Sequence, residues 1–176
     1  MPRTKVKAFR LDEDNYKLLK EIAELKGSTV SSLLEFLIKR FLEFEMLYEG
    51  IGIVMIAKPT LKKIVSICSK ELLREIGYWV AKDSTLPLIK LVYGEVNLRN
   101  LIKMLEIQSK YCGQFNFTIS NNSKIRVNFK TELGEKWGYY MQGWVEGLMN
   151  SLNIKDYNLE FSERYLLLTL PKECLT

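Results

Sequence analysis

Residues 7–42 read KAFRLDEDNYKLLKEIAELKGSTVSSLLEFLIKRFL, and this stretch decides the fold of the N-terminal part of the chain. Asp12 is a good N-cap for a helix, because its side chain can accept a backbone N–H of the first turn. Gly27 ends that helix, since glycine readily adopts the positive φ that a helix C-terminus often needs. Thr29 can then cap a second helix, whose apolar residues recur at helical spacing. The pattern therefore predicts two consecutive helices.

The second of these helices is too apolar for a short domain to bury alone. Its main stripe consists of Val30, Leu33, Leu34, Leu37, Ile38, Phe41 and Leu42, with Phe36 and Phe44 adding apolar surface on another side. A helix that is apolar over so much of its circumference needs more cover than one neighbouring helix gives. A second copy of the chain would supply that cover. We therefore expect a homodimer, with the pairing of dimers into tetramers left open.

Charge is sharply segregated at the N-terminus. Residues 1–10 carry four cations and no carboxylate, whereas residues 11–50 carry five cations and nine carboxylates. The whole chain has a formal net charge of +5. Segregation of this kind favours a face that meets an anion. The cations lie in a segment where Val6, Phe9 and Leu11 predict a short strand.

The order of strand, helix, Gly-x-Thr-x-Ser turn and helix resembles the ribbon-helix-helix repressors of the Arc/MetJ class. The resemblance covers about residues 3–46 and runs without a gap. In that family two chains pair their strands into an antiparallel ribbon that reads DNA. The resemblance implies a ribbon-helix-helix dimerisation and DNA-binding domain at residues 1–48, an obligate dimer, and a ribbon that enters the major groove of double-stranded DNA.

The resemblance also implies a set of DNA contacts. Alternation along a strand turns Phe9 and Leu11 toward the helices, and it turns Val6, Ala8 and Arg10 toward the DNA. An arginine there can contact guanine, while small apolar side chains touch thymine methyl groups. Free N–H groups at the start of the second helix suit a DNA phosphate. The full set of expected contact residues is Arg3, Lys5, Val6, Lys7, Ala8, Arg10, Thr29, Val30 and Ser31.

Residues 49–176 predict a second domain of mixed helix and sheet. Helices are expected at about 59–82, from the Asn97 cap to about 111, and within 132–152. Strands are expected at 86–93, in a hairpin formed by 115–120 and 124–130, and in a strand pair or one bent strand within 157–170. This order predicts an α+β sandwich, with helices packed on an antiparallel sheet and a role in sensing or oligomerisation.

The expected helix within 132–152 carries a largely aromatic stripe of Trp137, Tyr140, Met141, Trp144 and Leu148. Such a stripe offers the flat apolar surfaces that small effectors favour, so it is a candidate ligand pocket. It serves equally well as a core or a self-association face, and both alternatives stay open here. Gly143 and Gly147 leave a line on the same helix where another backbone can approach.

Composition excludes several function classes. The chain has no histidine, which rules out Ser-His-Asp, Cys-His and histidine–metal mechanisms, and we expect no catalytic residue, metal or cofactor. Its three cysteines are scattered, which fits a reducing compartment. No apolar run approaches the roughly 20 residues of a membrane span. We expect a cytoplasmic, nucleoid-associated protein.

The function predicted from the sequence is that of a sequence-specific DNA-binding transcriptional regulator, most simply a repressor, that acts as a homodimer. A small-molecule effector of the C-terminal domain is left open. The alternative is an antitoxin of a toxin–antitoxin pair that regulates its own operon. Antitoxins usually carry a short, polar, disordered tail, whereas the C-terminal part of this chain is long, apolar and aromatic.

Overall fold

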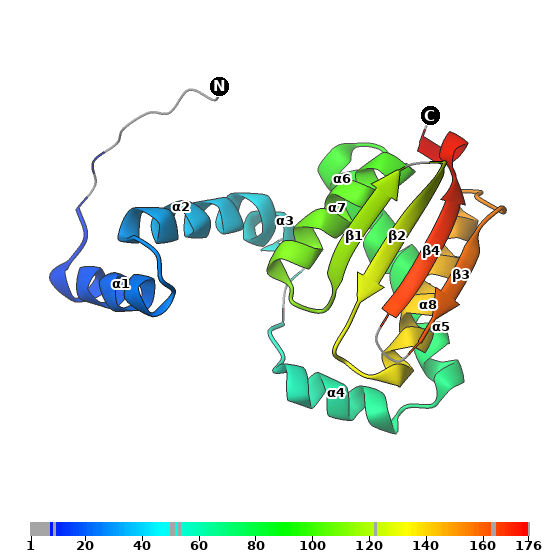
Figure 1. The fold of residues 1–176 in the computed structure, drawn as a ribbon, viewed down its shortest axis with the longest axis horizontal. Helices are drawn as coiled ribbons and strands as arrows, with labels where there is room; N and C mark the ends of the chain where they lie inside the picture. Colours follow the sequence, from blue (N-terminus) through cyan, green and yellow to red (C-terminus); the bar gives the residue numbers. More distant parts are fainter. Residues whose placement is uncertain are drawn as a thin grey trace. The chain divides into compact units, whose positions relative to one another are not determined.

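A computed structural model describes residues 8, 10–49, 52, 54–121, 123–162 and 165–175. The chain divides into two compact units, Met1–Leu47 and Tyr48–Thr176. The described part of the N-terminal unit is helical, and the C-terminal unit combines helices with a four-stranded antiparallel sheet (Figure 1). The predicted α+β class is confirmed at this level.

The two helices expected in the N-terminal unit are confirmed. They are α1 (Glu13–Leu25) and α2 (Val30–Arg40), and α2 is followed by a π-helical turn, Phe41–Glu45, and by α3 (Met46–Tyr48). Asp12 caps α1 by accepting the Asn15 backbone N–H at 2.8 Å. Gly27 has a φ of +61° and turns the chain toward α2. Three apolar side chains of this unit are buried: Ala23, Leu33 and Phe44.

The strand expected at the N-terminus stays a prediction. Arg3, Lys5, Val6, Lys7 and Phe9 lie outside the described residues. Ala8, Arg10 and Leu11 are described, and within this single chain they are exposed and belong to no helix or strand. A strand needs a partner for its backbone N–H and C=O groups, and in the predicted ribbon that partner is the second chain.

The sheet of the C-terminal unit has the strand order β1-β2-β4-β3. Its strands are β1 (Asn116–Asn121), β2 (Lys124–Lys130), β3 (Asn158–Phe161) and β4 (Tyr165–Pro171), so the expected hairpin and the closing strand pair are both confirmed. Alternate residues of β2 and β4 are buried, namely Ile125, Val127, Phe129, Leu166, Leu168 and Leu170. The intervening residues of β2, which include Lys124, Arg126 and Lys130, are exposed. One face of the sheet therefore forms the core.

Helices of the C-terminal unit lie behind this sheet and at one end of it (Figure 1). They are α4 (Lys58–Ile67), α5 (Lys70–Val80), α6 (Leu86–Tyr93), α7 (Leu98–Tyr111) and α8 (Glu135–Ser151). A second π-helical turn, Ala81–Thr85, joins α5 to α6, and a 3-10 turn, Lys172–Leu175, follows β4. The long central helix α8 contributes nine buried residues, more than any other described helix, and is therefore the main core element.

A glycine seam, formed by Gly77, Gly143 and Gly147, brings α5 and α8 into backbone contact. A β-carbon placed on Gly77 would overlap the Tyr140 carbonyl group, and one placed on Gly143 would overlap the Arg74 carbonyl group. A β-carbon on Gly147 would lie 2.9 Å from the Tyr78 carbonyl oxygen. The line of close approach expected from Gly143 and Gly147 is thus occupied by α5.

Two expectations for this unit are wrong. Residues 86–93 form helix α6, not a strand, and Pro87 lies in the first turn of that helix. The single helix expected at about 59–82 is interrupted at Cys68 and Ser69. Ser69 ends the run because its hydroxyl accepts the Leu72 N–H at 3.1 Å and so caps a new helix.

Candidate functional sites

The turn before α2 is the best-described part of the predicted DNA contacts. The Thr29 hydroxyl accepts the Ser32 backbone N–H at 3.1 Å, and it lies 3.0 Å from the Ser32 hydroxyl oxygen. Thr29 and Ser31 are exposed, and Val30 is half-buried. Thr29 therefore caps α2, as expected. The phosphate contact expected of Thr29, Val30 and Ser31 stays a prediction.

A large apolar surface runs along α2 and the turn that follows it. Ile38 is 54 % exposed, Phe41 50 % and Leu42 52 %. Phe36, Leu37 and Met46 are exposed as well. This set of six residues is called the apolar face of α2 below. Large exposed apolar patches are typical of interaction surfaces.

The aromatic stripe of α8 is divided between the core and a cavity. Trp137, Met141, Trp144 and Leu148 are buried, and Tyr140 is half-buried. The Trp137 and Tyr140 rings stack at 4.3 Å between centroids. The core alternative therefore holds for Trp137 and Leu148. Tyr140, Met141 and Trp144 also line a cavity, so the pocket alternative survives for these three.

That cavity has a volume of about 180 Å³ and lies within the C-terminal unit. Its lining comes from α3, α5, the π-helical turn, α6, α7, the segment before β1, and α8; the residues are Tyr48, Val80, Ser84, Thr85, Leu88, Gln108, Gln114, Phe115, Tyr140, Met141 and Trp144. All these side chains are neutral at pH 7. This set is called the aromatic cavity below.

Hydrogen bonds fix two sides of the aromatic cavity. The Trp144 indole N–H donates to the Thr85 hydroxyl at 2.9 Å, and Thr85 is buried. The Gln108 amide donates to the Tyr48 hydroxyl at 2.7 Å. Burial raises the pKa of Tyr48 to about 12, and burial alone raises the pKa of Tyr140 to about 12. Both phenols therefore stay protonated and neutral at physiological pH.

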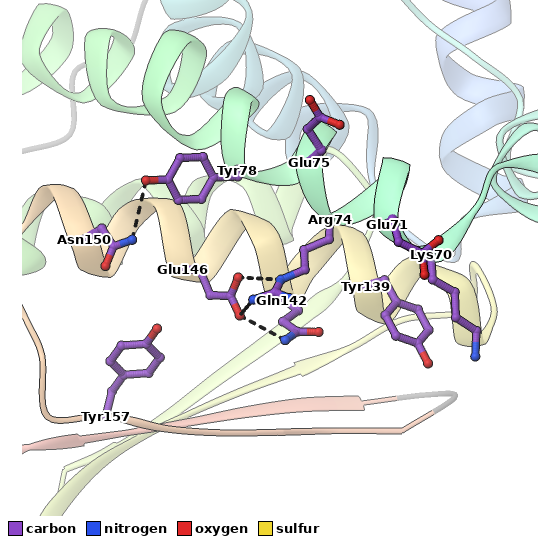
Figure 2. Close-up of a pocket in the computed structure, with 10 residues that line it drawn as sticks. All are labelled: Lys70, Glu71, Arg74, Glu75, Tyr78, Tyr139, Gln142, Glu146, Asn150 and Tyr157. Carbon is purple, nitrogen blue, oxygen red and sulfur yellow. Dashed lines mark hydrogen bonds and ion pairs between the residues drawn. The ribbon is translucent and has the colours of Figure 1, made fainter.

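A second hollow is an open, polar groove between α5 and α8, with a volume of about 730 Å³ (Figure 2). Arg74 of α5 and Gln142 of α8 both point at the Glu146 carboxylate (Figure 2). The guanidinium donates to it twice, at 2.7 and 2.9 Å, and the Gln142 amide donates at 2.9 Å. The pKa of Arg74 is raised by its hydrogen bonds to Glu146. Arg74 and Glu146 therefore pair with each other and leave neither of their charges unpaired for a ligand. The groove is better explained as a polar contact between two helices than as a binding site.

Sequence reasoning missed most of the aromatic cavity. Tyr48, Thr85 and Gln108 are far apart in the chain, and no spacing rule links them. One local signal was available, since Ser84 and Thr85 are polar residues directly before the apolar run LPLIKLV. A buried hydroxyl at such a place needs a partner, and here the partner is the Trp144 indole.

Comparisons of this chain with known proteins found no relative. The chain matches no family model, no curated protein and no solved structure. Within the described ranges, no group of three or more Cys, Asp or Glu residues is arranged to hold a metal ion. Among the described helices, none is both long and apolar enough to cross a membrane.

Proposed function

We propose that this chain is a homodimeric, sequence-specific DNA-binding transcriptional regulator. The observation that carries the proposal is the apolar face of α2, whose six residues remain exposed in a single chain. Pairing with a second copy would remove this surface from water, with a gain of about 25 cal/mol for each Å² buried. Such a pair would also give residues 5–11 of each chain a strand to pair with.

The cationic N-terminal segment supports DNA as the ligand of that dimer. Arg3, Lys5, Lys7 and Arg10 precede α1 with no carboxylate among them, and a dimer presents the set twice. Carboxylates begin at Asp12, which is used as the cap of α1. The two kinds of charge thus have separate roles, because the cations contact the DNA and the first carboxylates support the helix. The antitoxin alternative is less well supported, because residues 48–176 form a folded unit instead of a short polar tail.

Salt dependence tests whether the N-terminal cations lie on DNA. Sequencing the DNA that crosslinks to the full-length protein would first supply a preferred site. Affinity for that site is expected to fall by about 0.9 log unit per log unit of salt for each phosphate contacted. Lys63→Ala, which removes an exposed cation of α4, is the control and should leave the slope unchanged. A flat salt response would contradict the proposal.

Arg10 and Lys7 are expected to contribute differently to DNA binding. Strand alternation places Arg10 on the groove face, where a guanidinium can match the two acceptors of guanine. Arg10→Ala should cost about 1–3 kcal/mol on the preferred site and reduce the difference between sites. Lys7→Ala should weaken all sequences by a smaller, similar factor and lower the salt slope by about one.

Binding of both variants to a specific and a scrambled duplex measures this difference. If Lys7→Ala alone removed sequence preference, the strand register would be shifted by one residue. Val6, Ala8 and Arg10 would then face the helices instead of the DNA.

A further inference from the structure

We infer that the aromatic cavity of the C-terminal unit is a binding site for a small, neutral aromatic molecule that carries a hydroxyl or N–H group. The cavity holds about 180 Å³. For scale, an engineered apolar cavity of about 150 Å³ in another protein binds benzene. The space therefore suits one aromatic ring, or two fused rings of the size of indole.

The lining dictates the charge of the ligand. No ionisable group that is charged at neutral pH lines the cavity among the residues the structure describes. Burying an ion without a partner costs far more free energy than burying a neutral polar group. Four aromatic rings, those of Tyr48, Phe115, Tyr140 and Trp144, contribute to the walls. Flat apolar walls of this kind favour a planar, uncharged ring.

Polar groups in the same lining require the ligand to form hydrogen bonds. The Thr85 hydroxyl accepts the Trp144 N–H, and its own proton remains for an acceptor on the ligand. Tyr140 is half-buried at the same wall, where its phenol can donate or accept a hydrogen bond. A ligand that enters the cavity and leaves such groups unpaired loses their hydrogen bonds to water without replacement. A phenol can accept from Thr85 and donate to Tyr140, an indole can donate to Tyr140 only, and toluene can do neither.

The π-helical turn places two of these polar groups. Ser84 and Thr85 belong to the turn Ala81–Thr85, in which the Leu86 N–H donates to the Ala81 carbonyl group five residues earlier. A turn of this type is less favourable than a regular α-helical turn and occurs frequently at functional sites. Here it sets the Thr85 hydroxyl against the Trp144 indole, at the wall of the cavity.

The indole N–H signals of the three tryptophans give a direct test on the full-length protein. Trp144 lines the cavity, Trp137 is buried outside it, and Trp79 is 59 % exposed. Titration with phenol or indole is expected to shift the Trp144 signal in a ¹H–¹⁵N spectrum while leaving Trp79 in place. Benzoate, which has the same ring and a negative charge, is expected to leave all three signals unchanged. Equal shifts of all three signals, or binding of benzoate as tight as that of phenol, would overturn the inference.

Two variants distinguish the contribution of the Thr85 hydrogen bond to binding from the contribution of the cavity volume. Thr85→Val should weaken phenol by about three- to tenfold, the value of one hydrogen bond, and leave toluene unchanged. Thr118→Val, at an exposed position of β1, is the matched control and should alter neither affinity. Val80→Phe fills the cavity and should abolish the binding of both compounds. Unchanged phenol binding in Val80→Phe would place the ligand elsewhere and overturn the inference.

A regulatory role for the ligand rests on the proposed DNA binding, but the ligand site itself does not. Tyr48 lines the cavity and directly follows Leu47, the last residue of the N-terminal unit, along the chain. Phenol is therefore expected to change the affinity of the full-length protein for its DNA site. A Trp144 shift in a protein that binds no DNA would keep the ligand site and overturn the proposed function instead.

Discussion

Replacing Gly143 with alanine is expected to destabilise the C-terminal unit by about 3 kcal/mol. In an ordinary helix interior this substitution stabilises by about 1 kcal/mol, because alanine is the better helix former. Here the added β-carbon would overlap the carbonyl group of Arg74. Backbone atoms cannot turn aside as a side chain can, so α5 and α8 would have to separate. The sign of the effect is therefore reversed.

Urea unfolding followed by tryptophan fluorescence measures this loss, because all three tryptophans lie in the C-terminal unit. Gly138→Ala is the matched control on the same helix. Its β-carbon would lie 2.8 Å from the Phe161 ring, which belongs to a side chain and can shift. We expect a loss of about 1 kcal/mol there. A Gly143→Ala protein as stable as the wild type would show that α5 and α8 do not meet backbone to backbone.

Ile38→Asp is expected to abolish the dimer and, with it, DNA binding. Ile38 is 54 % exposed in the single chain, so a charge there costs the monomer little. In the proposed dimer the same position is buried, and an unpaired carboxylate in an apolar interface is strongly unfavourable. A symmetric interface contains the substitution twice. We expect the dimer to weaken by about a hundredfold or more, which corresponds to at least 2.7 kcal/mol.

Sedimentation equilibrium and a DNA-binding assay measure the two effects of Ile38→Asp. Ile64→Asp is the control, since Ile64 is an isoleucine of α4 with a similar exposure of 44 %. It should change neither the mass nor the affinity for DNA. Circular dichroism would show that both variants keep their helices. An Ile38→Asp protein that remains a dimer and binds DNA fully would remove the apolar face of α2 from the proposed interface.

Local signals in the sequence predicted most of the elements correctly. Asn97 was expected to cap a helix, and its side chain accepts the Asn100 N–H at 2.9 Å. The hairpin was expected around residues 121–123, and β1 pairs with β2 on either side of them. Caps and hairpin turns are decided by a few neighbouring residues, which explains why the sequence alone sufficed.

The strand expected at residues 86–93 was wrong because it was predicted from a short apolar run. LPLIKLVY has too few residues to distinguish a buried helix from a buried strand by periodicity. The flanking residues determine that this segment is helical. The π-helical turn before it is already in a helical conformation, and Gly94, with a φ of +77°, ends the helix. The proline was interpreted as a strand-edge signal, although it fits the first turn of a helix equally well.

Most of the candidate ligand site could not be predicted from the sequence. The aromatic stripe of α8 identified Tyr140, Met141 and Trp144, which is one wall of the cavity. The other walls come from residues as distant in the chain as Tyr48 and Gln108. Only tertiary packing brings these side chains together, so no local pattern could indicate which part of the stripe faces a void and which part is core.

The turn Ala81–Thr85 holds one residue more than the α-helical turn that would replace it. Loss of one codon there would restore a regular helix, in which one residue fewer makes nearly the same rotation. Leu88 and Ile89, both buried, would therefore keep facing the core. Loss of one codon within the regular helix α6 would instead rotate the residues after it by about 100°, given 3.6 residues per turn. In related genes we therefore expect a change of length by one residue to be tolerated at Ala81–Thr85 and not within α6.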